Sequence, residues 1–130
     1  MKLISPSAID HTCLIVTSLE KARQHYESLF DFSFQPREGD PSTLAVESSN
    51  VHFFITQVPN APPAFLQLQH ISFRVEDLEG VIKRLRAKGV DSFKSGEVNF
   101  FTHNNYRWCE WRDSDGIRVE CVESKNRVKA

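Results

Sequence analysis

The sequence predicts an α+β fold built from two tandem βαβββ modules. The first observation is an internal repeat offset by 59 residues, which aligns IDHTCLIVTSLEKARQHYESLF (9–30) with LQHISFRVEDLEGVIKRLRAKG (68–89). The second is a change of hydrophobic period inside each copy, from the alternation of a strand to the three- and four-residue spacing of a helix.

Each copy begins with a strand and continues into a helix. The strand over 11–16 has one apolar face and a wetter face that carries His11, and the strand over 70–75 carries His70 in the same place. Ser18 and Asp77 are N-cap residue types, and each precedes an amphipathic stripe. Gly89 is expected to close the second helix.

Three shorter strand candidates follow each helix. They lie in FSFQP, STLAVES and VHFFITQV in the first half, and in DSFKSG, YRWCEWR and IRVECVE in the second. The segment 59–65, PNAPPAF, is expected to be a stiff linker because it holds three prolines in five residues. We therefore expect one domain over 1–130, with module one at about 8–58 and module two at about 66–124.

Composition limits the possible functions. The chain has 130 residues, of which 40% are hydrophobic and 25% charged, and a formal net charge of −1. No basic footprint for nucleic acid, no signal peptide and no membrane-spanning apolar run is visible, so a cytoplasmic location is expected. Cys13, Cys109 and Cys121 are odd in number and widely spaced, which predicts reduced and mostly packed thiols.

Two histidines alone make an incomplete metal site, since divalent metals generally take a carboxylate as well. Glu120 lies in the middle of the last predicted strand among apolar neighbours, where a carboxylate is usually partnered. His11, His70 and Glu120 are thus a candidate two-histidine, one-carboxylate set. The alternatives are that the histidines are ordinary surface or core residues, and that Glu120 pairs with Arg74 or Arg118.

The chain resembles the vicinal oxygen chelate superfamily, which includes glyoxalase I, extradiol dioxygenases, fosfomycin-resistance enzymes, methylmalonyl-CoA epimerase and bleomycin-resistance proteins. The two repeat segments and WRDSDGIRVECVE (111–123) carry the resemblance. It implies a cupped mixed sheet around a metal and ligand cavity, with His11, His70 and Glu120 as ligands of one divalent ion. It also implies a homodimer, sometimes with modules exchanged between chains.

The chain departs from the four-ligand members of that superfamily. Overlaying NVHFFIT (50–56) on GIRVECV (116–122) sets Phe54 opposite Glu120 and His52 opposite Arg118. Phenylalanine cannot bind a metal, so only His11 is expected from the first half. Three ligands resemble the dioxygenases and the fosfomycin-modifying transferases. The metal itself is open among Fe, Mn, Ni, Co and Zn.

Other side chains are candidates for lining the same cavity: Cys13, Phe54, Arg74, Tyr106, Trp108, Glu110 and Arg118. Glu110 is either a catalytic base or a rim residue, and each arginine either holds an anionic substrate group or pairs with Glu110 or Glu120. The aromatic residues are pocket walls or plain core, and Cys13 contacts substrate or is a buried inert thiol. The insertion FFTHNNYR (100–107) is a lid or a longer hairpin.

Three functions remain open at this point. The first is a metal-dependent enzyme acting on a small molecule with vicinal oxygens, by lyase, isomerase, dioxygenase or thiol-transferase chemistry. The second is a metal-free binding protein of the bleomycin-sequestering type, which near-neutral charge and a complete ligand set disfavour. The third is a structural or sensor protein that retains a vestigial site.

Overall fold

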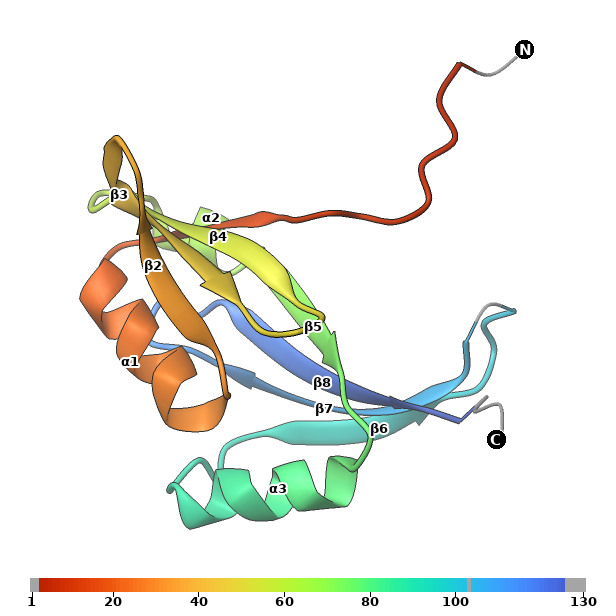
Figure 1. Ribbon diagram of the computed structural model, residues 1–130. Coiled ribbons are helices and arrows are strands. Elements are labelled where there is room, and N and C mark those ends of the chain that lie inside the picture. The colour runs from red at the N-terminus through yellow and green to blue at the C-terminus, as the bar shows by residue number, and fades with distance from the viewer. Residues whose placement is uncertain (1–2, 103, 126–130) are drawn as a thin grey trace. The chain divides into compact units, whose positions relative to one another are not determined.

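The computed structural model describes residues 3–102 and 104–125. It divides into two compact units, Met1–Ala61 and Pro62–Ala130. Each unit has a four-stranded mixed sheet and one long helix, in the order strand, helix and three strands (Figure 1). The predicted α+β architecture of two βαβββ modules is confirmed.

The first unit contains β1 (Cys13–Val16), α1 (Leu19–Leu29), β2 (Ser33–Arg37), β3 (Asp40–Glu47) and β4 (His52–Gln57). The second contains α2 (Pro63–Leu66), β5 (His70–Arg74), α3 (Leu78–Ala87), β6 (Lys94–Val98), β7 (Tyr106–Arg112) and β8 (Arg118–Ser124). The sheet orders are β1-β4-β3-β2 and β5-β8-β7-β6. In both sheets the first strand pairs parallel to the last, and the other pairs are antiparallel.

Strand register shows that the two units repeat one another residue by residue. Cys13 pairs with Phe54 in the first unit, and Ser72 pairs with Glu120 in the second. Because Cys13 and Ser72 are equivalent in the repeat, Phe54 does occupy the place of Glu120. The alignment made from sequence is therefore confirmed at this position.

Both long helices begin at the predicted N-caps. The Ser18 side chain accepts a hydrogen bond from the Lys21 backbone N–H, and the Asp77 side chain accepts one from Gly80. At the end of α3, Gly89 has φ +83° and donates to the Arg86 carbonyl, as predicted for its helix-closing role.

The linker differs from the prediction of a stiff extended segment. Pro63–Leu66 forms the short helix α2, with Pro63 at its start and Leu66 buried. Proline is well tolerated in the first turn of a helix because its missing N–H would have no partner there. The proline-rich composition excluded a strand correctly but did not reveal this turn.

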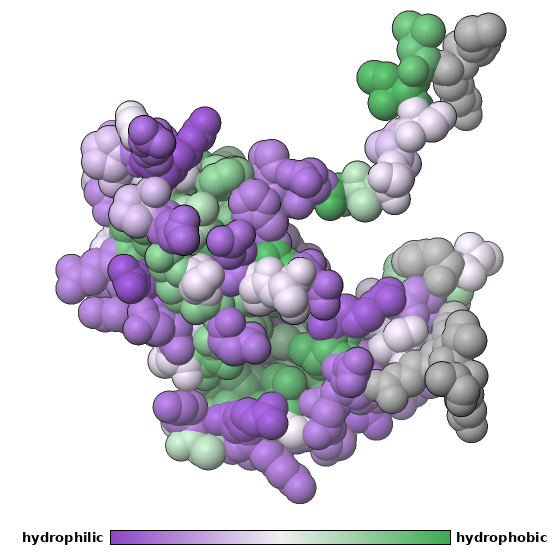
Figure 2. Space-filling model, viewed as in Figure 1, coloured by the Kyte–Doolittle hydropathy of each residue, from purple (hydrophilic) through white to green (hydrophobic). Residues whose placement is uncertain are grey.

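Each sheet buries one face against its helix. Leu14, Val16, Phe53 and Ile55 are buried in the first unit, where α1 contacts β3 and β4. The second unit repeats this arrangement, with α3 against β7 and β8 and a purple, mostly hydrophilic outer surface on α3 (Figure 2). The opposite, wetter face of each sheet carries the polar candidates.

Within the described residues, no helix has the length and apolarity needed to cross a bilayer.

Candidate functional site

A cluster of three ligand-type side chains lies on the wetter face of the second sheet. His70 begins β5, Glu120 is in the middle of β8, and Glu110 pairs with Glu120 from β7. One ligand atom from each residue lies within 4.8 Å of the others. His70 Nε2 is 3.3 Å from Glu120 Oε1, and the Glu120 side chain is only 12% exposed. We call these three residues the second-half cluster.

Arg118 forms an ion pair with Glu110, with 3.0 Å between Arg118 Nε and Glu110 Oε2. Of the alternatives open for this arginine, the structure shows the pairing with Glu110. Glu120 faces His70 instead. The two carboxylates therefore have different partners: Glu110 pairs with a guanidinium group and Glu120 with an imidazole. Arg74 is exposed on β5.

Aromatic residues lie on the same face of β7 as Glu110. Trp108 is half-buried beside Gly96 of β6, where a Cβ atom would lie 2.9 Å from the Trp108 ring. Tyr106 is also half-buried, and its ring stacks on Phe101 with centroids 6.1 Å apart. The absence of a side chain at Gly96 leaves the space that the Trp108 ring occupies.

The insertion 100–107 covers most of the connection from β6 to β7 and the first two residues of β7, and its residue 103 lies outside the described residues. Ser124 Oγ donates to Asn104 Oδ1 over 2.6 Å, and Lys125 N donates to the Asn105 carbonyl. Its second half is therefore attached to the end of β8. Because β6 and β7 are antiparallel neighbours, the segment is the connection of a long β-hairpin, which was one of the two alternatives.

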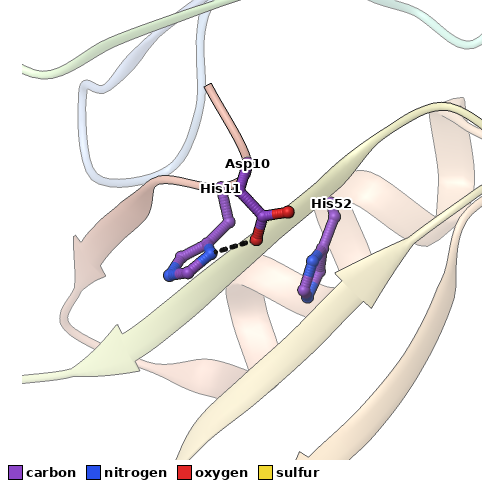
Figure 3. Close-up of side chains that lie close together, drawn as sticks. All are labelled: Asp10, His11 and His52. Atoms are coloured by element: carbon purple, nitrogen blue, oxygen red, sulfur yellow. Dashed lines mark hydrogen bonds and ion pairs between the residues drawn. The ribbon is translucent and has the colours of Figure 1, made fainter. Parts of the chain in front are cut away.

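His11 lies in the first unit, just before β1, beside Asp10 and His52 (Figure 3). Asp10 Oδ2 is 2.7 Å from His11 Nδ1, and an ionised carboxylate can only accept, so the ring N–H donates. This hydrogen bond lowers the pKa of Asp10. Phe54 contacts both imidazoles, with ring centroids 5.0 Å from His11 and 5.1 Å from His52. We call Asp10, His11 and His52 the first-half cluster.

Cys13 differs from the expected buried thiol, because it is exposed. Its sulfur lies 3.3 Å from the Thr56 hydroxyl on the adjacent strand β4. The thiol points to the wetter face, as the alternation of β1 requires. Cys109 and Cys121 are buried as expected, and burial raises the pKa of Cys109 to about 11 and that of Cys121 to about 12.

Asp10 and His52 were not among the residues that the sequence singled out as ligands. The sequence alignment sets His52 opposite Arg118, two residues from the position equivalent to Glu120, so that a one-residue error of register would not bring it there. In the second unit, however, Arg118 is the register partner of His70. The equivalent partner of His11 is therefore His52, and this signal was present in the repeat.

The donor set of the second-half cluster fits a divalent metal ion. Imidazole nitrogen and carboxylate oxygen suit Zn, Fe, Ni, Co and Mn. Because the Glu120 carboxylate is largely buried, a bound cation would stabilise its negative charge. Glu110 also lies within ligand distance of His70 and Glu120, and one of its carboxylate oxygens is paired with Arg118.

Comparison with known proteins supports the fold. A family model described as Glyoxalase/Bleomycin resistance protein/Dioxygenase superfamily matches residues 8–121. No curated protein matches the sequence. A protein structure from the mobile metagenome of V. pseudocholerae is 20% identical, with a TM-score of 0.77, and the match covers 96% of this chain and 100% of that one.

Two further solved structures show the range of proteins with this fold. A bleomycin-binding protein complexed with bleomycin is 14% identical, with a TM-score of 0.67 and coverage of 90% of this chain and 98% of that one. Lactoylglutathione lyase from Agrobacterium tumefaciens is 16% identical, with a TM-score of 0.65 and coverage of 92% and 95%. At these identities the likeness shows the fold and leaves the activity open.

Proposed function

Because this chain belongs to the Glyoxalase/Bleomycin resistance protein/Dioxygenase superfamily, we propose that it is a divalent-metal-dependent enzyme acting on a small molecule with vicinal oxygens. The observation that carries the proposal is the 3.3 Å approach of His70 Nε2 to Glu120 Oε1 on the half-buried face of β5 and β8. His70 and Glu120 are two of the three proposed protein ligands. His11 is the third, since it holds the position of His70 in the first half.

A divalent ion held by these ligands supplies a Lewis acid for a carbonyl or epoxide oxygen. The protein residues then have separate tasks. Glu110 is positioned to accept or return a proton, and its ion pair with Arg118 orients it on the shared face. Trp108 provides a flat apolar wall on the same strand, as most small-molecule sites have. Lyase, isomerase, dioxygenase and thiol-transferase reactions all fit these roles.

Metal analysis of the purified chain tests the proposal. We expect one tightly bound divalent ion per chain and a rise in melting temperature on adding Mn²⁺, Fe²⁺, Ni²⁺ or Zn²⁺. Glu120→Gln and His70→Gln should each weaken the tight binding event by roughly tenfold or more. Glu79→Gln is the matched control, because Glu79 is an exposed carboxylate that pairs with Arg107. A tight binding event of unchanged affinity in Glu120→Gln would refute the ligand assignment.

Reaction class is a separate measurement on the metal-loaded protein. Three assays distinguish the classes: catechols in air, a thiol with an epoxide, and a methylglyoxal hemithioacetal. If the protein is active in one of these assays and both Glu120→Gln and Glu110→Gln lose that activity, the result supports the proposed enzyme and the role of Glu110 as its base. A homodimer belongs to the same proposal, and light scattering should give about twice the 14.9 kDa chain mass.

Metal-free binding of a small molecule is the second candidate function. It is favoured by the structural likeness to a protein that was solved with bleomycin bound. The two functions differ in one observable: a sequestering protein binds its ligand equally well in Glu120→Gln and in the presence of a chelator. Ligand binding that survives both treatments, with no turnover in the three assays, would replace the enzyme proposal.

A further inference from the structure

The first-half cluster brings together three donor groups that the proposed catalytic site does not use as a set. One ligand atom each from Asp10, His11 and His52 lies within 4.8 Å of the others. Figure 3 shows the Asp10 carboxylate between the two imidazole rings, whose centroids are 5.6 Å apart. The group is therefore as compact as the second-half cluster.

Backbone pairing fixes this arrangement. The Phe54 N–H donates to the Thr12 carbonyl, which continues the β1–β4 pairing one residue beyond the strand and brings His11 to the start of β4. His52 is the first residue of β4, and the Phe54 ring contacts both imidazoles. The two histidines are thus held by strand pairing and by a shared aromatic neighbour.

The chemistry of the three groups favours a metal ion over a purely internal contact. Two neutral imidazoles and one ionised carboxylate are a donor set that late first-row divalent ions bind well. The side chains are accessible, with His11 48% and Asp10 86% exposed, so an ion can enter and keep water ligands. An ion bound at His11 Nδ1 takes the place of the hydrogen bond to Asp10, and the single proton of the neutral ring is then on Nε2 instead of Nδ1.

We infer that Asp10, His11 and His52 form a second divalent-metal site, which the first half builds alone and which takes Zn²⁺ or Ni²⁺. The inference adds to the proposed function by giving His11 two alternative uses. When His11 is a ligand in the proposed catalytic set, only Asp10 and His52 remain for the second site. The first-half site is therefore fully formed only in chains whose second-half ligands are empty or removed.

The experiment isolates the first-half site in the full chain. In the background His70→Gln/Glu120→Gln, Zn²⁺ is titrated by calorimetry, with circular dichroism to check the fold. We expect one bound Zn²⁺ per chain and shifted histidine ring signals for His11 and His52 in NMR spectra, while the half-buried His25 is unchanged. Adding His52→Gln or Asp10→Asn should weaken binding by roughly tenfold or more.

The matched control is Asp31→Asn in the same background, since Asp31 is an exposed carboxylate of the first unit outside the cluster. It should leave Zn²⁺ binding unchanged. Absence of Zn²⁺ binding in the background up to about 1 mM overturns the inference, as does binding that is indifferent to His52→Gln. A third outcome separates the two proposals. If the His70→Gln/Glu120→Gln variant binds Zn²⁺ but the wild type shows no tighter binding event, the first-half site is supported and the proposed catalytic ligand set is refuted.

Discussion

A single thiol of this protein is chemically accessible. Cys13 is exposed beside Thr56, whereas Cys109 and Cys121 are buried between β7, β8 and α3 with pKa values raised to about 11 and about 12. The thiolate is the reactive form, so both burial and the raised pKa slow the reaction of the buried pair. The residue types alone gave no means of telling the three apart.

We therefore predict that a thiol reagent at pH 8 labels one cysteine quickly in the native protein and all three in denaturant. Cys13→Ser should remove the fast reaction, while Cys109→Ser should leave it intact. The measurement is reagent absorbance against time, with mass spectrometry to identify the labelled residue. Fast labelling of two thiols in the folded protein would contradict the assigned burial.

His25 should make the stability of the protein depend on pH. Burial lowers its pKa from 6.5 to about 4, and its ring contacts Tyr26 edge-on with centroids 4.9 Å apart. The unfolded chain binds the proton below about pH 6.5 and the native chain only below about pH 4, so stability is lost as pH falls through this window. The loss approaches roughly 3 kcal/mol at the lower end.

Urea unfolding at pH 7, 6, 5 and 4.5 measures this effect. The variant His25→Gln cannot titrate, so its free energy of unfolding should fall less steeply with decreasing pH than that of the wild type. His11→Gln is the comparison, because His11 is half exposed and belongs to the surface. Equal slopes for the wild type and His25→Gln would show that His25 does not carry the dependence.

At the scale of the secondary-structure elements, the two halves share a hydrogen bond between the last strand of the half and the start of its long helix. Gln57 Oε1 accepts a hydrogen bond from the Leu19 N–H over 2.9 Å, and Glu123 Oε1 accepts one from the Leu78 N–H over 3.0 Å. Gln57 and Glu123 are equivalent in the repeat. Each satisfies a helix N-terminal donor that has no partner within the helix.

This equivalence supplies its own control for a mutation. Glu123→Gln should cost little, because the amide oxygen can accept the same hydrogen bond as Gln57 does in the first half. Glu123→Ala should destabilise the protein by about 1–2 kcal/mol, since the N–H of the buried Leu78 loses its acceptor. Denaturant midpoints of the three proteins measure the difference. Equal midpoints for the alanine and glutamine variants would contradict the capping role.

Elements were predictable where local chemistry decides them. The N-caps Ser18 and Asp77 and the closing Gly89 follow from side-chain hydrogen bonding and from backbone freedom, which are properties of a few neighbouring residues. The turn at 113–116 is similar, because Asp113 Oδ1 accepts from the Asp115 and Ile117 N–H groups. Helix α2 escaped prediction because only its packed Leu66 distinguishes it from an extended proline-rich linker.

At the scale of the whole molecule, the repeat made part of the site predictable. It identified His11 and His70 as equivalents and set Phe54 in the place of Glu120, and strand register confirms this alignment. It also contained the signal that His52 lies opposite His11, as Arg118 does opposite His70. It could not show that Arg118 pairs with Glu110 or that the Asp10 carboxylate contacts His11, because these contacts depend on side-chain orientation, which alternation along one strand does not determine. The ligand set of His11, His70 and Glu120 stays a prediction.

The same topology predicts how local stability is distributed over the chain. β4 and β8 are interior strands with partners on both sides, and they carry the buried Phe53, Ile55, Val119 and Cys121. β2 and β6 lie at the edges of their sheets, and β2 is interrupted by a bulge at Pro36/Arg37. An amide in an interior strand exchanges only when the sheet opens, whereas an edge amide needs a smaller fluctuation.

Native-state hydrogen exchange should therefore give the same ranking in both halves. Amides of β4 and β8 should exchange at least roughly tenfold more slowly than those of β2 and β6. Phe53→Leu removes aromatic packing in the first core, where Tyr26 and Phe53 rings lie 5.7 Å apart, and it should speed exchange in β4. Edge strands that exchange as slowly as β4 and β8 would contradict the ranking and would point to further partners for those edges.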